Sequence, residues 1–250
     1  MLLIPSIDLR GGLCVRLLRG DFASETRYDT DARTLLGRYR TLGAEWLHVV
    51  DLDGARDGTQ GNHALIRTLA QRHADERPLQ LQVGGGVRRM ENVDALLQLG
   101  AARIVIGSAA AERPDAVAAW LQHFGGERLC LAFDVRIDSA GVPRVQTRGW
   151  QEATSLSLWD AVAAFTAGEL RHVLCTDIDR DGALAGPNLA LYQEAHSRFP
   201  QICWQASGGI ARGADLVALA GTGVAAAISG KALLERRIPV EELRPFLPNA

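Results

Sequence analysis

The sequence predicts an α/β fold, a single (β/α)8 TIM barrel in which eight parallel strands alternate with eight helices. Short apolar runs alternate with helical periodicity along the whole chain. Segments from the two halves of the chain also repeat one another. The length of 250 residues is close to that of one such barrel. No linker or shift in composition divides the chain, so we expect a single domain over residues 1–250.

The individual elements follow from the apolar patterns. Eight apolar runs predict buried parallel strands: Leu2–Ile7, Trp46–Val50, Leu79–Val83, Arg103–Ile106, Arg128–Phe133, His172–Thr176, Cys203–Ala206 and Ala225–Ile228. Helical periodicity fills the segments between them: Ala32–Leu42, Asn62–His73, Met90–Leu99, Pro114–Phe124, Ser157–Ala167, Asn188–Ser197, Gly213–Ala220 and Ala232–Arg236. The sequence Leu-Gly-Ala at 42–44 and 99–101 places a capping glycine after two of the helices.

An internal repeat distinguishes a closed barrel from an open, doubly wound sheet, which is the main alternative. Val83–Arg89 returns as Ala206–Arg212, a shift of 206 − 83 = 123 positions. The chain therefore resembles two fused half-barrels of about 1–125 and 126–250. Eight regular units with such a repeat favour closure, because a closed barrel leaves no exposed strand edge.

Carboxylates repeat as well, with a shift of 126 positions. Asp8 pairs with Asp134, and Asp51 pairs with Asp177. Asp8 and Asp134 follow strands 1 and 5, which face one another across the mouth of a barrel whose active site lies at the C-terminal strand ends. Two such carboxylates suit proton transfer, with one acting as base and the other as acid. The alternative is that strand-end aspartates only cap helices or brace loops.

Glycine turns follow strands 3, 4, 7 and 8, and turns of this kind bind phosphate through backbone N–H groups. The first cup contains Gly84, Gly85, Gly86, Gly107 and Ser108, and the second contains Ser207, Gly208, Gly209, Gly230 and Lys231. The two cups lie on opposite sides of a ring of eight strands, so they predict a ligand with two phosphates. The alternative is that these glycines only form tight turns.

Further polar and aromatic residues are candidates for the site. Trp150 follows strand 5, where its ring could stack on a heterocycle or anchor the loop. Arg88 follows a glycine turn and could reach the ligand, although an isolated arginine is more often a surface residue. His48 lies in strand 2, where a buried core histidine is the alternative. Arg16 completes this set.

Composition excludes several function classes. The net charge of −2 gives no basic field for nucleic acid or anionic membranes. No apolar run is long enough for a membrane helix. Cys14, Cys130, Cys175 and Cys203 are widely spaced, which indicates reduced core cysteines in a cytoplasmic protein. The histidines show no ligand-type spacing, so we expect no metal site. The dinucleotide motif G-x-G-x-x-G is also absent.

Motifs over nearly the whole chain resemble the phosphoribosylformimino-aminoimidazole-carboxamide ribotide isomerases of histidine biosynthesis. They are residues 4–9, 15–17, 20–22, 47–55, 83–88, 105–108, 133–136, 176–178, 180–182 and 207–210. The resemblance implies an Amadori rearrangement of an aminoaldose, with Asp8 as base and Asp134 as acid. It also implies that Thr176 and Asp181 assist at the ring oxygen and that Trp150 stacks on the imidazole. Which carboxylate donates the proton stays open between Asp134 and Asp181.

The same resemblance sets the expected ligands and the rival functions. We expect Arg16, Gly20, His48, Arg88 and Asp177 to bind a substrate with two phosphates, in a monomer that needs no cofactor and no protein partner. One rival is the cyclase subunit of imidazole glycerol phosphate synthase, which resembles this family and needs a glutaminase. A second is a dual-substrate isomerase that also acts on phosphoribosyl anthranilate, and a third is a non-catalytic phosphosugar sensor.

Overall fold

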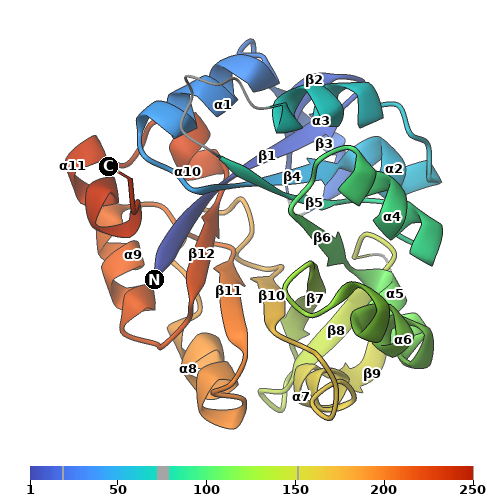
Figure 1. Cartoon of the computed structure of the whole chain (residues 1–250). Helices are drawn as coiled ribbons and strands as arrows, with labels where there is room; N and C mark the ends of the chain where they lie inside the picture. The colour runs from blue at the N-terminus through green and yellow to red at the C-terminus, as the bar shows by residue number, and fades with distance from the viewer. Residues whose placement is uncertain (19, 72–78, 151, 250) are drawn as a thin grey trace.

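A closed barrel of parallel strands forms the centre of the molecule, with helices around it (Figure 1). The computed structural model describes residues 1–18, 20–71, 79–150 and 152–249. Within these residues the barrel strands follow one another around the ring as β1 (Leu2–Arg10), β4 (Trp46–Asp51), β5 (Gln80–Gly84), β6 (Arg103–Ile106), β7 (Leu129–Ile137), β10 (His172–Asp177), β11 (Cys203–Ser207) and β12 (Ala226–Ser229). The ring closes where β12 pairs in parallel with β1, with Leu2 opposite Ala226. The predicted (β/α)8 barrel is confirmed.

The helices lie outside the ring (Figure 1). They are α1 (Ala32–Thr41), α2 (Leu52–Asp57), α3 (His63–Ala70), α4 (Met90–Gln98), α5 (Ser108–Glu112), α6 (Pro114–Phe124), α7 (Leu158–Ala163), α8 (Leu189–Arg198), α9 (Gly213–Ala220), α10 (Lys231–Leu234) and α11 (Val240–Leu243), followed by a 3-10 turn at Arg244–Phe246. The glycines expected after two helices adopt the left-handed conformation, with φ of 94° at Gly43 and 105° at Gly100. Over the described residues, none of these helices is long and apolar enough to cross a membrane.

Some predicted helix bounds were wrong. The helix predicted over Ser157–Ala167 ends at Ala163, because the following backbone bonds close tight i→i+3 turns. The helix predicted over Asn62–His73 begins at His63 and is helical to Ala70, and residues 72 and 73 lie outside the described part of the chain. The last predicted helix, Ala232–Arg236, is a single turn at Lys231–Leu234.

Two β-hairpins that the apolar pattern did not predict extend from the barrel. The first consists of β2 (Leu13–Leu18) and β3 (Asp21–Arg27) and pairs with the end of β1. The second consists of β8 (Pro143–Thr147) and β9 (Glu152–Ser157) and pairs with the end of β7. Polar residues interrupt these ribbons, so they contain no continuous apolar run. Since β1 and β7 lie opposite one another in the ring, the hairpins project from opposite sides of its C-terminal end.

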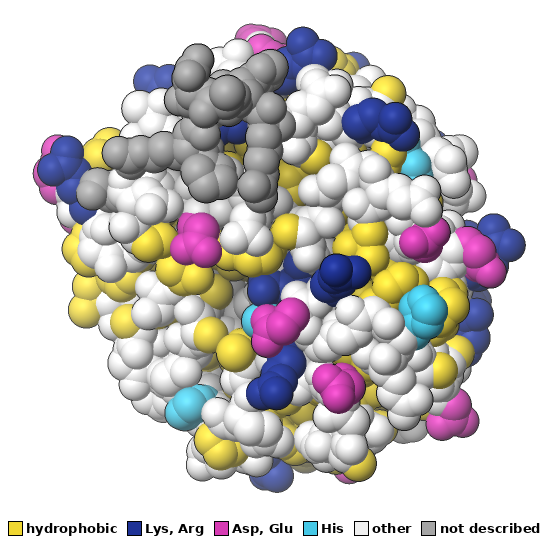
Figure 2. Space-filling model, viewed as in Figure 1, with side chains coloured by type: hydrophobic (Ala, Val, Ile, Leu, Met, Phe, Trp, Pro, Cys, Tyr) yellow, Lys and Arg dark blue, Asp and Glu magenta, His cyan; other side chains and the backbone are white. Residues whose placement is uncertain are grey.

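Alternating side chains divide the apolar core into two layers. Outward residues such as Leu81 and Val83 pack against the helices. Inward residues such as Ile4, Val105 and Leu174 fill the barrel itself. Figure 2 shows cationic and anionic side chains interspersed over the face that is drawn, as the net charge of −2 would suggest.

Candidate active site

Carboxylates and their partners gather at the C-terminal ends of the barrel strands. Asp8 lies near the end of β1, and Asp134 and Thr176 face one another in register on β7 and β10. Asp181 lies in the turn after β10, where its backbone N–H donates to the Asp177 carbonyl. Of the predicted catalytic residues, all four therefore come from this end of the barrel.

Arg16 on β2 joins two of these carboxylates. Its Nη1 lies 3.0 Å from Asp8 Oδ2, and its Nη2 lies 2.5 Å from Asp181 Oδ1. Burial raises the pKa of the Asp8 carboxyl group above 3.8, the positive charge of Arg16 opposes this shift, and the nearby charge of Asp181 adds to it. Arg16 thus offsets part of the cost of burying the Asp8 charge.

Trp150 closes the site from the opposite hairpin. Its Nε1 donates a hydrogen bond of 2.7 Å to Asp134 Oδ2. Its ring packs on Gly20 at the tip of the first hairpin, where a Cβ atom would lie only 2.6 Å from Trp150 Cε3. Burial raises the pKa of Asp134, whereas hydrogen bonds from Trp150 and Thr176 lower it. The tips of the two hairpins therefore meet above Asp134.

The glycine turns after β5 and β11 are tightly packed against neighbouring loops. A Cβ atom at Gly85 would collide with the Asp51 carbonyl oxygen, and one at Gly208 would lie 2.8 Å from the Asp177 carbonyl oxygen. Both glycines have positive φ, at 109° and 104° respectively. Only glycine fits these turns without strain, so the fold itself requires them, whatever they bind.

The turns after β6 and β12 are less crowded by backbone. A Cβ atom at Gly107 would meet no atom within 4 Å, and one at Gly230 would lie 3.2 Å from Arg16 Nη1. Ser108 Oγ accepts a hydrogen bond of 2.9 Å from the Arg148 N–H. Lys231 Nζ donates to the Gly182 carbonyl at 3.2 Å. The second cup therefore lies beside two cationic side chains.

Asp51 and Asp177 brace equivalent loops in the two halves. Asn62 Nδ2 donates to Asp51 Oδ1 at 2.6 Å, and Asn188 Nδ2 donates to Asp177 Oδ2 at 2.7 Å. Both carboxylates are buried. The structure thus uses Asp177, predicted to bind substrate, as a loop brace.

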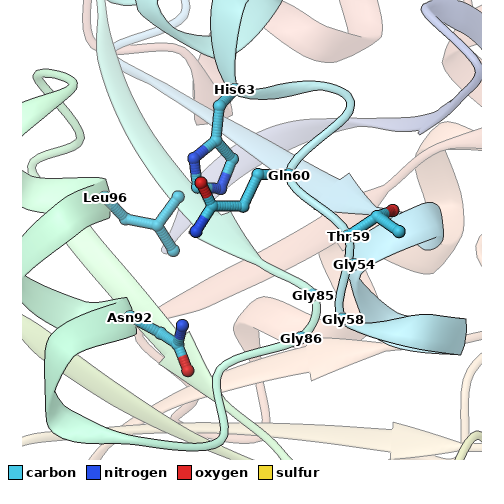
Figure 3. Close-up of a pocket in the computed structure, with 9 residues that line it drawn as sticks. All are labelled: Gly54, Gly58, Thr59, Gln60, His63, Gly85, Gly86, Asn92 and Leu96. Atoms are coloured by element: carbon cyan, nitrogen blue, oxygen red, sulfur yellow. The ribbon is translucent and has the colours of Figure 1, made fainter.

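Arg88 does not join the carboxylates. Its guanidinium bonds the Ala55 carbonyl oxygen at 3.2 Å. Nearby, a small pocket lies beside the Gly85–Gly86 turn, lined by Gly54, Gly58, Thr59, Gln60, His63, Gly85, Gly86, Asn92 and Leu96 (Figure 3). It is bounded by α3 and α4, and none of the four predicted catalytic residues lines it. In the second half, Gly186 donates its N–H to the Gly209 carbonyl at the equivalent turn.

Sequence reasoning identified His48 but missed the polar side chains that bond it inside the barrel. His48 is buried there, and its Nδ1 lies 3.2 Å from Gln82 Nε2. Gln82 in turn bonds Gln205 from the other half. A signal was available, since these two glutamines are related by the same 123-residue shift as the glycine turns.

Comparison with known proteins places this barrel in a family. Residues 2–239 match the family described as "Histidine biosynthesis protein". The match spans nearly the whole chain, including the four glycine turns and the four predicted catalytic residues described above. The chain therefore belongs to the histidine biosynthesis protein family, a family of enzymes of that pathway.

Proposed function

We propose that this enzyme is an aldose–ketose isomerase that performs the Amadori rearrangement of N-(5-phosphoribosylformimino)-5-aminoimidazole-4-carboxamide ribotide. The observation that carries the proposal is the pair of carboxyl groups on opposite strands of the ring, Asp8 on β1 and Asp134 on β7. Burial raises the pKa of both groups. Carboxyl groups with raised pKa values suit general acid–base catalysis near neutral pH.

The proposed chemistry needs one acid and one base. An acid donates a proton to the ring oxygen as the aminoaldose ring opens and an imine forms between C1 and the nitrogen. The Asp8 carboxylate then removes the proton from C2 of the protonated imine, giving a neutral enolamine. The C2 hydroxyl of the enolamine loses its proton to a base while C1 takes up a proton from an acid, and this yields the C2 ketone. Asp134 is the proposed acid, and its Oδ2 accepts the hydrogen bond from Trp150.

The proposed substrate has a phosphate at each end. We assign one phosphate to the cup with Gly107 and Ser108, and the other to the cup with Gly230 and Lys231. The cationic side chains of Arg16 and Lys231 beside the second cup support this assignment. Holding both ends would fix the sugar carbons between the two aspartates, which lowers the entropic part of the barrier.

The rearrangement oxidises C2 and reduces C1 within one molecule, so it needs no external oxidant or reductant. We therefore propose that the enzyme works without a cofactor. We also propose that it acts as a single-domain monomer in the cytoplasm, without an obligate protein partner. Activity of the purified chain in the presence of a chelator, with its mass measured by light scattering, would test these points.

The family also contains the cyclase, which a substrate assay distinguishes from the isomerase. We expect the purified chain alone to convert the aminoaldose to the aminoketose. A cyclase would instead consume the aminoketose when ammonium is supplied. Turnover of phosphoribosyl anthranilate would indicate the dual-substrate isomerase, and binding of the aminoaldose without turnover would indicate a sensor.

Replacing the proposed base gives a direct mutational test. Asp8→Asn retains the shape of the side chain but cannot accept the C2 proton, so kcat should fall by roughly 10²–10⁴-fold. Substrate binding, measured by calorimetry, should change little. A loss of less than about tenfold would contradict the role of Asp8 as base. The larger loss among Asp134→Asn and Asp181→Asn would identify the acid.

A further inference from the structure

A chain of hydrogen bonds runs through the barrel interior below the carboxylates. It consists of His48 on β4, Gln82 on β5, Arg103 on β6 and Gln205 on β11, each at most 7% exposed. His48 lies opposite Ser6, two residues before Asp8 on β1. The chain therefore extends from the region just below Asp8 toward the other end of the barrel.

Arg103 determines which way the Gln82 amide points. A guanidinium can only donate hydrogen bonds, so the Gln82 atom that lies 3.2 Å from Arg103 Nη1 is the carbonyl oxygen Oε1. Arg103 is itself held by the Trp46 ring, 4.1 Å from its Cζ atom, and by the Glu127 carbonyl at 3.2 Å. Its position, and hence the orientation of the amide, is fixed by this packing.

Gln205 alone could not fix that orientation. The two glutamines exchange reciprocal bonds, from Gln82 Nε2 to Gln205 Oε1 at 2.7 Å and from Gln205 Nε2 to Gln82 Oε1 at 3.0 Å. Turning both amides over would leave an equivalent reciprocal pair. The bond from Arg103 removes this ambiguity.

The orientation of Gln82 in turn selects the tautomer of His48. An amide nitrogen can only donate, so His48 Nδ1, 3.2 Å from Gln82 Nε2, must be the acceptor. Burial lowers the pKa of His48 to about 4, and the charge of Arg16 contributes to this. A neutral histidine whose Nδ1 accepts carries its proton on Nε2, which lies on the side of the ring away from Gln82.

We infer that Arg103 and Gln82 are positioning residues that hold His48 as a neutral Nε2–H donor for an oxygen of the sugar between Asp8 and Asp134. This inference rests on the proposed function for the identity of the sugar. A neutral donor can bond a substrate oxygen without bringing a second positive charge beside Arg16. The bonds from Arg103 to Gln82 and from Gln82 to His48 thereby link packing in the barrel interior to the hydrogen bonding of the substrate.

Gln82→Glu reverses the bond to His48. Arg103 would pair with the new carboxylate, which can only accept, so His48 Nδ1 must then carry a proton. Nitrogen-15 NMR of histidine-labelled protein, assigned with His48→Gln, reports the tautomer without any substrate. We expect Nε2–H in the unmodified enzyme and Nδ1–H in Gln82→Glu, because burial favours the neutral ring. An Nδ1–H tautomer in the unmodified enzyme, or no change in the variant, would overturn the inference.

Kinetics test whether the tautomer matters for turnover. Loss of one hydrogen bond to the reacting sugar should lower kcat of Gln82→Glu by about tenfold. The matched control is Gln205→Met, which removes the partner of Gln82 but makes no change next to His48. It should keep the Nε2–H tautomer and a kcat within about threefold of the unmodified enzyme. Full kcat in Gln82→Glu despite a changed tautomer would refute the positioning role.

A replacement variant and a substrate-free measurement allow the inference and the proposed function to be tested separately. If Gln82→Glu does not fold, as judged by circular dichroism, Arg103→Met replaces it. That variant should populate both tautomers of His48, because the Gln82 amide loses the donor that orients it, and a single Nε2–H tautomer there would refute the inference. The NMR result needs no substrate, so an unmodified chain that shows the expected tautomer but no isomerase activity would count against the proposed function alone.

Discussion

Removal of Arg16 should destabilise the protein strongly, because its guanidinium forms ion pairs with two buried carboxylates. The bonds measure 3.0 Å to Asp8 and 2.5 Å to Asp181, and the side chains of both aspartates are 9% exposed. Breaking a buried ion pair by removing one partner costs about 3–5 kcal/mol. We therefore expect Arg16→Met to lower the free energy of unfolding by about that amount at pH 8.

This loss should depend on pH in a defined direction. The pKa of Asp8 is raised above 3.8 in the folded protein. Between 3.8 and the folded pKa, the folded state holds a proton that the unfolded chain has lost, so stability falls as pH rises through this window. Without Arg16 the folded pKa of Asp8 rises further. The difference between Arg16→Met and the unmodified protein should then shrink as the pH is lowered and Asp8 becomes neutral.

Urea unfolding at a series of pH values from about 5 to 8 measures this effect. The control is Arg237→Met, which breaks a 2.6 Å ion pair with Glu235 in which the arginine is 50% exposed. Exposed pairs contribute at most about 1 kcal/mol. If both variants lose the same stability, or if the loss in Arg16→Met does not vary with pH, the assigned role of Arg16 is wrong.

Three further predictions concern the opposite hairpin and the glycine turns. Trp150→Phe removes the donor to Asp134, so the pKa of that carboxyl group should rise further, and an unchanged carbon-13 NMR titration of Asp134 would contradict the 2.7 Å bond. Gly85→Ala places a methyl group against the Asp51 carbonyl at positive φ and should cost about 1–3 kcal/mol of stability, measured by thermal unfolding. Gly107→Ala meets no atom within 4 Å, so it should change stability less but raise KM by about tenfold if a phosphate approaches this turn. An unchanged KM in this variant would contradict the proposal that a phosphate binds at the first cup.

The barrel strands could be predicted because burial on both faces leaves a continuous apolar run. The runs Ile104–Ile106 and Leu129–Phe133 are examples, and both are strands of the ring. The hairpins could not be found in this way. The β8–β9 ribbon carries polar residues such as Arg144 and Glu152, and its pairing depends on contact with β7 rather than on a local pattern.

The candidate site was predicted in part for a related reason. The repeat indicated that Asp8 and Asp134 lie at the same rim, because residues at equivalent strand ends share a rim in any barrel. The bond between Arg16 and Asp181 spans 165 residues, and no local pattern could reveal it. The hydrogen bond from Trp150 to Asp134 could not be predicted either, because the tip of a hairpin can turn toward the site or away from it.

The pairing of β1 with β12 also has a consequence for synthesis of the protein on the ribosome. The first strand to emerge contains Leu2, and its neighbour across the closing seam contains Ala226. At the usual elongation rate of about 5–20 residues per second, on the order of ten seconds or more pass between the appearance of these two strands. During that interval the nascent chain carries β1 with one edge unpaired, and an unpaired edge invites association with other chains. The last strand of the barrel to be made is thus also the one that protects the first.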